Sequence, residues 1–370
     1  MQRSHLSLIR VGGMGSGTAR CFCSESKPCK RSRVQFDEAE YSGEKACLFD
    51  CLPDDIVLSI LCYLSASADC PSDLVSVMKT CKRMNRLGKN PLVLEKATLK
   101  SISIRVENWS PPAHKFLKRC VRAGNVEACY LLGMIECYCL GLRGDGCHTH
   151  TRKGLSYLLR ASRRGHAAAT YSLAVIFFNG TGMGKSQENL STGFSLCQRA
   201  TQLGYVDAMR ELGHCLQDGY GVAKDVPRGR RLLLDANTRE LAVSRSSRPV
   251  ASAAALPGEG SSRSEYCYLH SDFGCDVPAP EVHPANRFMA EWFQTRQNLG
   301  ESVRLCANAN CSRPETRRFE FRVCSMCALA CYCSRACQAV HWKTVHSAAC
   351  TAAIAARRVR IFNNALARFE

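Results

Sequence analysis

The sequence lacks any long hydrophobic run. Its longest nearly uncharged stretch, residues 167–178, has about 12 residues and is followed by Asn179-Gly180-Thr181-Gly182, whereas a membrane-spanning helix needs roughly 20 apolar residues. A secretory signal is missing too, because Arg3 and Arg10 flank only a short apolar patch before a glycine-rich stretch. We therefore expect a soluble protein of the cytoplasm or nucleus that does not associate with membranes.

The first 47 residues have few large apolar side chains, and the first acidic residue is Glu25. Such a segment cannot bury enough apolar surface to fold, so residues 1–47 are predicted to be a disordered basic N-terminus. The late first acid leaves an organelle transit peptide open as an alternative. The segment also holds a basic cluster, which fits either a nuclear address or a solvated tail: Lys27, Lys30, Arg31 and Arg33.

Cysteine and positive charge are present in excess. The 370 residues include 25 cysteines, and the formal net charge is +18. Without a secretory signal these cysteines favour reduced thiols over a disulfide framework. The basic residues are scattered over several predicted helices, with no stripe of interleaved basic and aromatic residues. This distribution favours solvated helix faces over nucleic-acid binding, although charge alone would allow the latter.

Residues 48–97 change to an apolar helical pattern. Pro53 suits a first helical position, and Asp54 and Asp55 suit the positive end of the helix dipole. A second helix is predicted with Ser72 as its cap, and a third ends near Pro91. About 50 residues bury too little apolar surface to be secure alone. The first helix carries an apolar stripe made of Ile56, Val57, Ile60, Leu61 and Leu64.

The letters LPDDIVLSIL, CKRMNRL and NPLVL in this region resemble an F-box. That family is a three-helix module that docks on the adaptor subunit of cullin-based ubiquitin ligases. The loop at 65–71 is longer than the usual link of the family, which leaves the packing of the second helix open. An ordinary helical subdomain is the alternative. The resemblance implies that five residues lie at or beneath the adaptor-binding surface: Leu52, Pro53, Ile56, Ile60 and Leu61.

Residues 115–242 contain a repeat with spacings of 41 and 39 residues between corresponding glycines. Small alanines let neighbouring helices approach, leucines fill the layer between them, and glycines end helices in left-handed turns. The pattern resembles the SEL-one-like repeats, relatives of the tetratricopeptide repeat, which present a concave protein-binding face. A plain helical spacer is the alternative. The aligned triplets are Gly124/Ala128/Leu132, Gly165/Ala169/Leu173 and Gly204/Ala208/Leu212.

The segments around the repeats complete the predicted organisation. Residues 98–114 are predicted to be a connector, and residues 243–282, rich in Ser, Ala, Pro and Gly, a flexible linker. Residues 283–300 are predicted to form an amphipathic helix, whose aromatic face is expected to contact the next domain. Residues 301–351 are predicted to be a zinc finger, and residues 352–370 a basic amphipathic helix.

Eight of the 25 cysteines fall within residues 306–350, together with two histidines. Thiolate and imidazole are zinc ligands, and two closed tetrahedra need eight ligands. Cys333 and Cys337 are four residues apart, so we expect them to face one ion from a single helical turn. Cys331 is left over, and spacing alone does not decide between His341 and His346. A segment this small would depend on the metal for its fold, on the order of 10 kcal/mol.

The order of these ligands, with YCSRACQ and the later Trp, His and Cys, resembles a MYND finger. The resemblance implies two structural zinc ions held in crossed pairs, and it leaves out Cys331 and His341. It also implies that Gln338 and Trp342 line a groove for proline-containing peptides, although Trp342 as a core residue is an equal alternative. The implied ligands are Cys306, Cys311, Cys333 and Cys337 for one ion, and Cys324, Cys327, His346 and Cys350 for the other.

The predicted fold is mostly α: a three-helix F-box, an α-solenoid of helix pairs and a small two-zinc MYND finger. The combination resembles a plant-type family of F-box proteins. It implies a non-enzymatic substrate receptor of a ubiquitin ligase, with the repeats and finger selecting target proteins. One alternative is a transcriptional or scaffold protein that assembles no ligase. A lysine methyltransferase with a MYND finger is the other, but the chain has no Asn-His-Ser-Cys motif for its cofactor.

Overall fold

The structure, a computed structural model, describes residues 48–141, 147–182, 186–246, 282–295 and 304–366. The predictions for residues 1–47 and for most of the linker therefore lie outside the described residues. The chain divides into two compact units after Asp50. All elements discussed below belong to the second unit, Cys51–Glu370. No helix in the described ranges is long and apolar enough to cross a membrane.

Four α-helices, one more than the predicted three, build the N-terminal module, because Asn90 and Pro91 start a further short helix. Pro53 precedes α1, and both Arg83 and Arg86 lie 2.8 Å from Asp54 in its first turn. Cys70, not the predicted Ser72, caps α2, because its backbone N–H and thiol both donate to Asp73. The bounds are α1 Asp54–Ser67, α2 Pro71–Thr80, α3 Lys82–Gly88 and α4 Pro91–Glu95.

The predicted connector is folded rather than extended. It contains α5 (Leu99–Ile102), the 3-10 turn η2 (Val106–Asn108) and the start of α6 (Pro111–Ala123). Helix α6 begins four residues before the predicted repeat region, because Ser110 accepts a hydrogen bond from Ala113 and Pro111 occupies the first turn. The N-terminal module therefore continues into the repeats without a spacer.

Asn125 fixes the joint between the two parts. Its buried side-chain amide donates to the carbonyl oxygens of Leu94, Glu95 and Ala97 at 2.7–3.0 Å. Its side-chain oxygen accepts from the N–H of Ala128 and caps the next helix. One side chain thus satisfies the end of α4 and the start of α7.

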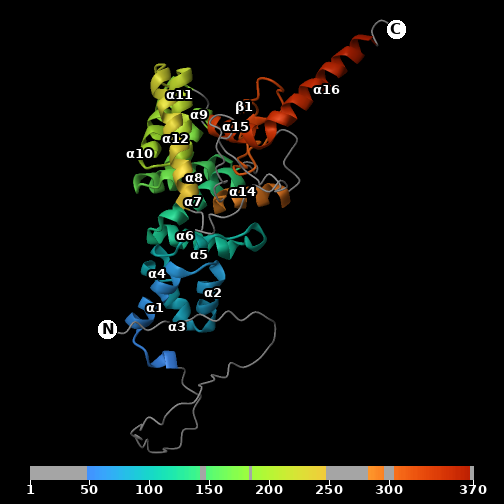
Figure 1. Cartoon of the computed structure of the whole chain (residues 1–370). Helices are drawn as coiled ribbons and strands as arrows, with labels where there is room; N and C mark the ends of the chain where they lie inside the picture. The colour runs from blue at the N-terminus through green and yellow to red at the C-terminus, as the bar shows by residue number, and fades with distance from the viewer. Residues whose placement is uncertain (1–47, 142–146, 183–185, 247–281, 296–303, 367–370) are drawn as a thin grey trace, which may run out of the picture. The chain divides into compact units, whose positions relative to one another are not determined.

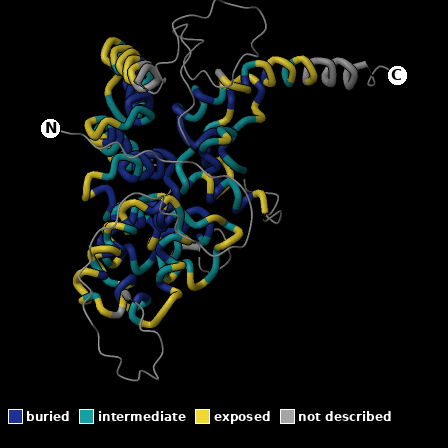
Figure 2. Tube along the Cα trace, turned by 60° about the horizontal axis from the view of Figure 1, so that its bottom comes forward, coloured by how far each residue is buried: buried dark blue, intermediate teal, exposed yellow. Residues whose placement is uncertain are grey.

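The repeats form an array of antiparallel helix pairs, as predicted (Figure 1). The aligned glycines all adopt the left-handed backbone conformation, with φ from 85° at Gly165 to 100° at Gly124. Most side chains of the inner helices α7, α9 and α11 are buried, whereas the outer helices α8, α10 and α12 each have an exposed side (Figure 2). The bounds are α7 Val126–Met134, η3 Ile135–Leu140, α8 Cys147–Arg163, α9 Ala167–Asn179, α10 Gln187–Gln202, α11 Val206–Asp218 and α12 Val226–Ser246.

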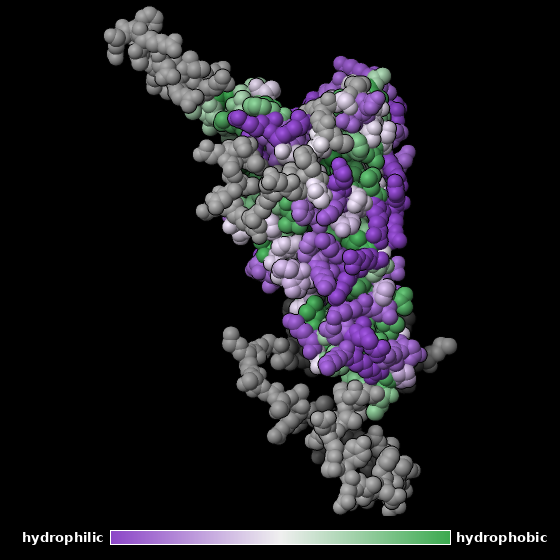
Figure 3. All heavy atoms as spheres, turned by 180° about the vertical axis from the view of Figure 1, so that it is seen from behind, coloured by the Kyte–Doolittle hydropathy of each residue, from purple (hydrophilic) through white to green (hydrophobic). Residues whose placement is uncertain are grey.

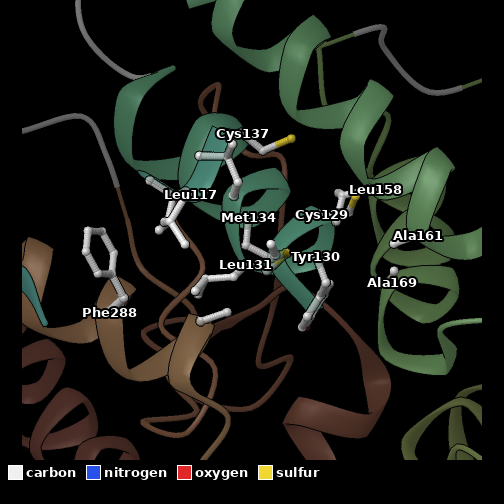
Figure 4. Packing of buried hydrophobic residues seen from close by; sticks show 14 of the residues in the cluster. Leu117, Cys129, Tyr130, Leu131, Met134, Cys137, Leu158, Ala161, Ala169 and Phe288 are labelled. Atoms are coloured by element: carbon white, nitrogen blue, oxygen red, sulfur yellow. The ribbon is translucent and has the colours of Figure 1, made fainter. Parts of the chain in front are cut away.

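The core of the array continues into a helix that follows the linker. Helix α14 (Pro284–Thr295) buries Phe288, Met289 and Trp292 in the same cluster as residues of α6–α9. Figure 4 shows Phe288 on α14 beside side chains of α6 and α7, and Ala161 of α8 beside Ala169 of α9. The aromatic face of this predicted helix is therefore a core contact.

The C-terminal part contains little regular structure before its helices. Strands β1 (Arg322–Val323) and β2 (Cys331–Tyr332) pair antiparallel, and Leu305 bridges to Pro314. Helix α15 (Arg335–His341), the π-helical turn η5 (Trp342–His346) and α16 (Ser347–Leu366) follow. Residues 304–350 are called the finger below. The predicted basic character of the last helix lies mostly on side chains outside the described residues.

Candidate metal centre and docking faces

The first ligand cluster brings together sulfur atoms from three parts of the finger. Cys306, Cys311, Cys333 and Cys337 have their sulfur atoms within 4.8 Å of one another. The Cys311–Cys333 distance is 3.5 Å, and the Cys333–Cys337 distance is 3.7 Å. Neighbouring thiols donate to Cys311 and hold its pKa well below the usual range. This crowding is what a cation would relieve.

The second cluster contains three cysteines and one histidine. Cys324, Cys327, His346 and Cys350 place their ligand atoms within 4.8 Å of one another, and all four side chains are buried. The Cys324 and Cys350 sulfur atoms lie 3.9 Å apart, and the Cys327 sulfur lies 3.5 Å from Nε2 of His346. The cluster joins the turn after β1 to the helices η5 and α16.

Both clusters have the dimensions of a closed tetrahedral site. Zinc–sulfur bonds of about 2.3 Å put neighbouring sulfur atoms about 3.8 Å apart. The observed separations of 3.5–3.9 Å fit that geometry. Four ligands in each group leave no position for a catalytic water. These residues fit a metal ion that stabilises the fold.

Cys333 differs from the prediction in one respect. It does not share a helical turn with Cys337, because Ser334 caps α15 and accepts from the N–H of Cys337 at 3.1 Å. Cys333 instead lies at a bend just after β2. A pair spaced by three residues can therefore come from a strand end and a helix start.

The two residues predicted to be left out lie outside both clusters. The Cys331 thiol donates to the carbonyl oxygen of Leu305 at 3.0 Å. His341 uses Nδ1 to bind the Tyr332 hydroxyl at 3.0 Å, and burial beside His346 lowers its pKa. Both side chains already have partners that suit a packed finger.

The predicted peptide-binding residues lie on the second half of the finger. Gln338 is half-buried on α15, and Trp342 is 38% exposed at the start of η5. The Trp342 ring meets His346 edge-on at 5.7 Å between centroids. Trp342 thus packs on a ligand with one side and offers the rest of its ring to solvent.

A buried arginine joins the finger to the repeats. Arg313 is 5% exposed, donates to the Ser172 hydroxyl of α9 at 2.7 Å and lies over the ring of Tyr138. A buried cation needs such partners. Its place in the protein interior shows that the finger packs as part of the repeat array.

Two further contacts fix the ends of α9 and α11 to the finger. Asn179 at the end of α9 donates to the carbonyl oxygen of Cys333 at 2.8 Å and accepts from Arg317. Buried Glu211 of α11 accepts from the N–H of Ala336 at 2.9 Å, at the positive end of α15. Burial raises the pKa of Glu211, and that backbone donor opposes the shift.

One side of the inner helices is therefore covered. We call this side of α7, α9 and α11, which contacts α14 and the finger, the repeat face. The sequence did not predict its coverage. The sequence nevertheless contained an indication that this face is covered. Residues 167–178 contain no charged side chain, so α9 has no side suited to solvent. On the side of the molecule drawn in Figure 3, the described surface is mostly hydrophilic with small apolar areas.

The N-terminal module has an exposed apolar row on α1. Ile56, Ile60 and Tyr63 are 46%, 44% and 77% exposed, at spacings that share one side of a helix. Of the predicted adaptor residues, Leu61 is buried in the module, Leu52 is half-buried and Pro53 is exposed. Tyr63 was not among the predicted adaptor-binding residues, because it lies outside the apolar stripe identified on this helix from the sequence.

Comparisons with known families agree with these parts. The F-box-like profile matches residues 49–96. The profile of plant tetratrico peptide repeats matches residues 100–212, and the Sel1 repeat profile matches residues 206–236. None of these three profiles reaches the finger.

Two relatives from Arabidopsis thaliana match over most of the chain. F-box protein At1g67340 is 51% identical over 82% of this chain and 80% of its own. The chain belongs to this plant F-box family. A second member, F-box protein At5g50450, is 48% identical over 82% of this chain and 85% of its own. The predictions of an F-box and of helical repeats are confirmed.

Two solved structures match this F-box protein at low identity and low TM-score. A Sel1 repeat protein from Oxalobacter formigenes is 19% identical, with a TM-score of 0.31, over 37% of this chain and 96% of its own. The antigen c5321 of uropathogenic Escherichia coli is 14% identical, with a TM-score of 0.32, over 64% of this chain and 41% of its own.

Proposed function

We propose that this protein is a non-catalytic target-recognition subunit of a cullin-based ubiquitin ligase. Its F-box would bind the adaptor subunit. The observation that carries the proposal is the row of Ile56, Ile60 and Tyr63, which the module leaves uncovered while it buries Val57 and Leu61. Large apolar side chains exposed together on one helix favour a protein partner.

The three side chains of this row are also spaced so that one face of the helix can insert into a partner protein. Residues 56, 60 and 63 are separated by four and three positions, as in helices that insert one face into a partner. The ion pairs of Arg83 and Arg86 with Asp54 fix the start of this helix. A fixed helix loses little conformational freedom when it binds.

Adaptor binding can be tested with the full chain and purified adaptor. We expect Ile56→Ala with Ile60→Ala to weaken binding by at least about tenfold, since buried apolar anchors commonly contribute more than 1 kcal/mol each. Leu203→Ala with Leu234→Ala is the matched control, because these leucines are 41% and 49% exposed on the repeats. A wild-type chain that does not bind the adaptor would overturn the proposal and favour the scaffold alternative.

We further propose that the finger is of the MYND type and holds two zinc ions. The eight ligands and their sulfur spacings support this assignment. A bound zinc ion would supply structural cross-links between the finger's loops and helices. The part-exposed ring of Trp342, with Gln338 one turn earlier, would contact proline-containing target peptides. The absence of disulfides among the described cysteines supports a reducing compartment, either cytoplasm or nucleus.

A further inference from the structure

A groove lies where the F-box meets the repeats. Its wall is formed by α2, by the segment from α5 to η2, by the start of α6 and by α14, and its volume is about 910 Å³. That volume is within the range of ligand sites, about 300–1,000 Å³. We call it the junction groove. The repeat face is covered, so this groove is a concave surface beside the F-box that stays open.

The floor of the junction groove is apolar. Val75, Ile104 and Phe116 line it and are only half-buried, so part of each side chain faces the groove. Phe288 of α14 lies among them and is nearly fully buried. Such a floor gains free energy from covering apolar side chains rather than ions alone.

The rim of the groove is basic. Five basic side chains and two acidic ones line it, a difference of three positive charges: Lys79, Lys100, Arg105, Arg119 and Arg287 against Asp69 and Glu291. Both acids are already paired, Asp69 with Lys100 and Glu291 with Arg105, each at 2.9 Å. In the described part of the chain, Lys79 and Arg119 form no ion pair.

We propose that the junction groove binds an acidic peptide segment that carries apolar side chains. The unpaired Lys79 and Arg119 would attract carboxylates, while the apolar floor would receive the neighbouring side chains. Among the described residues that line the groove, only Phe116 and Phe288 are aromatic, and Phe288 is buried. This is too little stacking surface for a single-stranded nucleic acid.

The inference deepens the proposed function and rests on it in one respect, namely that the peptide belongs to a target. Because α2 of the F-box forms one wall, a peptide held here would lie directly beside the adaptor-binding module. Target recognition and adaptor binding would then use different helices of the same module, α2 for the peptide and α1 for the adaptor. Peptide binding itself can be measured without the adaptor.

The test uses the full chain and two libraries of 12-residue peptides. One alternates Asp or Glu with Phe, Leu or Ile, and the other replaces each acid by Lys or Arg. We expect only the acidic library to bind, and more weakly as salt rises. Lys79→Glu with Arg119→Glu should weaken binding at least about tenfold, since opposed charges become like charges. The matched control, Lys224→Glu with Arg228→Glu, reverses two exposed charges on the repeats.

A second variant separates lost charge from misfolding. Ala113→Trp fills the groove without changing its charge, and it should block the peptides while adaptor binding and zinc content stay at wild-type level. Equal binding of acidic and basic libraries, no binding of either, or full binding by both groove variants would each overturn the proposal. A chain that binds acidic peptides but no adaptor would instead overturn only the ligase assignment.

Discussion

Single residues of the finger were the easiest to predict. Cysteine and histidine spacing limits the ligands, and the MYND resemblance chose His346 over His341. The structure gathers the same eight side chains into the same two groups. The position of Cys333 before α15 was missed, because spacing alone does not reveal that Ser334 starts the helix.

Zinc content tests the ligand assignment residue by residue. We expect the full chain to carry two zinc ions, measured by plasma mass spectrometry after dialysis against metal-free buffer. Cys337→Ser and His346→Ala each remove one of four ligands and should lose metal. Cys331→Ser and His341→Ala are matched controls and should keep both ions. Metal loss from either control would contradict the crossed pairs.

His283 should make stability depend on pH. Burial lowers its pKa to about 4, and its Nδ1 accepts from the N–H of Ala285. A lowered histidine pKa means that the unfolded chain binds more protons, so stability falls as pH drops from about 6.5 towards 4. Between pH 7.5 and pH 5 the loss should reach about 2 kcal/mol.

His283→Asn is the variant that isolates this effect. Asparagine keeps an acceptor for the Ala285 N–H but does not titrate. Urea unfolding at pH 7.5 and pH 5 should show a smaller stability loss for the variant than for the wild type. The metal ligands are the same in both chains, so their own pH dependence cancels. Equal losses would mean that His283 has the same pKa in the folded protein as in the unfolded chain.

At the scale of helices, glycine sets how closely the repeat pairs approach. A Cβ at Gly154 of α8 would lie 2.6 Å from the backbone nitrogen of Cys137 and 2.7 Å from the oxygen of Gly133. Gly229 of α12 would likewise meet the oxygen of Gly213 at 2.7 Å. The sequence alignment found the turn glycines and the alanines. It missed these contacts because the partner helix is known only from the fold.

Gly154→Ala should therefore destabilise the protein. In an open helix this change would stabilise by about 1 kcal/mol, but here the backbone of η3 blocks the methyl group. We expect a net loss of about 1–3 kcal/mol from overpacking, measured by urea unfolding. Ser156→Ala on the exposed side of the same helix should change stability by less than about 0.5 kcal/mol. A stabilised Gly154→Ala chain would show that the helices can separate.

At the scale of the whole molecule, the parts and their order were predictable, but their packing was not. LPDDIVLSIL and the Gly-Ala-Leu triplets are local signals that each module carries in its own sequence. The contact of Arg313 with Ser172 joins residues 141 positions apart. No periodicity encodes such a pair, and a basic residue in a cysteine-rich segment is normally expected in solvent.

Metal removal should loosen the repeats as well as the finger. Glu211 and Asn179 hold α11 and α9 to finger residues whose positions depend on the clusters. With a strong chelator we expect faster amide hydrogen exchange in α9 and α11, measured by mass spectrometry. Exchange in α1–α4 should stay unchanged and serves as the internal control. Unchanged exchange in α9 and α11 would mean that the repeats hold their shape without the finger.

The covered repeat face also changes what a shortened chain would do. Cutting before Pro284 would remove Phe288, Trp292 and the whole finger, and would bare Tyr130, Leu131 and Met134, which share their cluster. Newly exposed apolar surface of that kind adheres to unrelated proteins. A deletion that abolishes target binding would not locate the target on the finger, and a deletion that gains partners would not reveal natural ones. Point changes on the outer surface, such as Trp342→Ala, keep the face covered and give the sounder map.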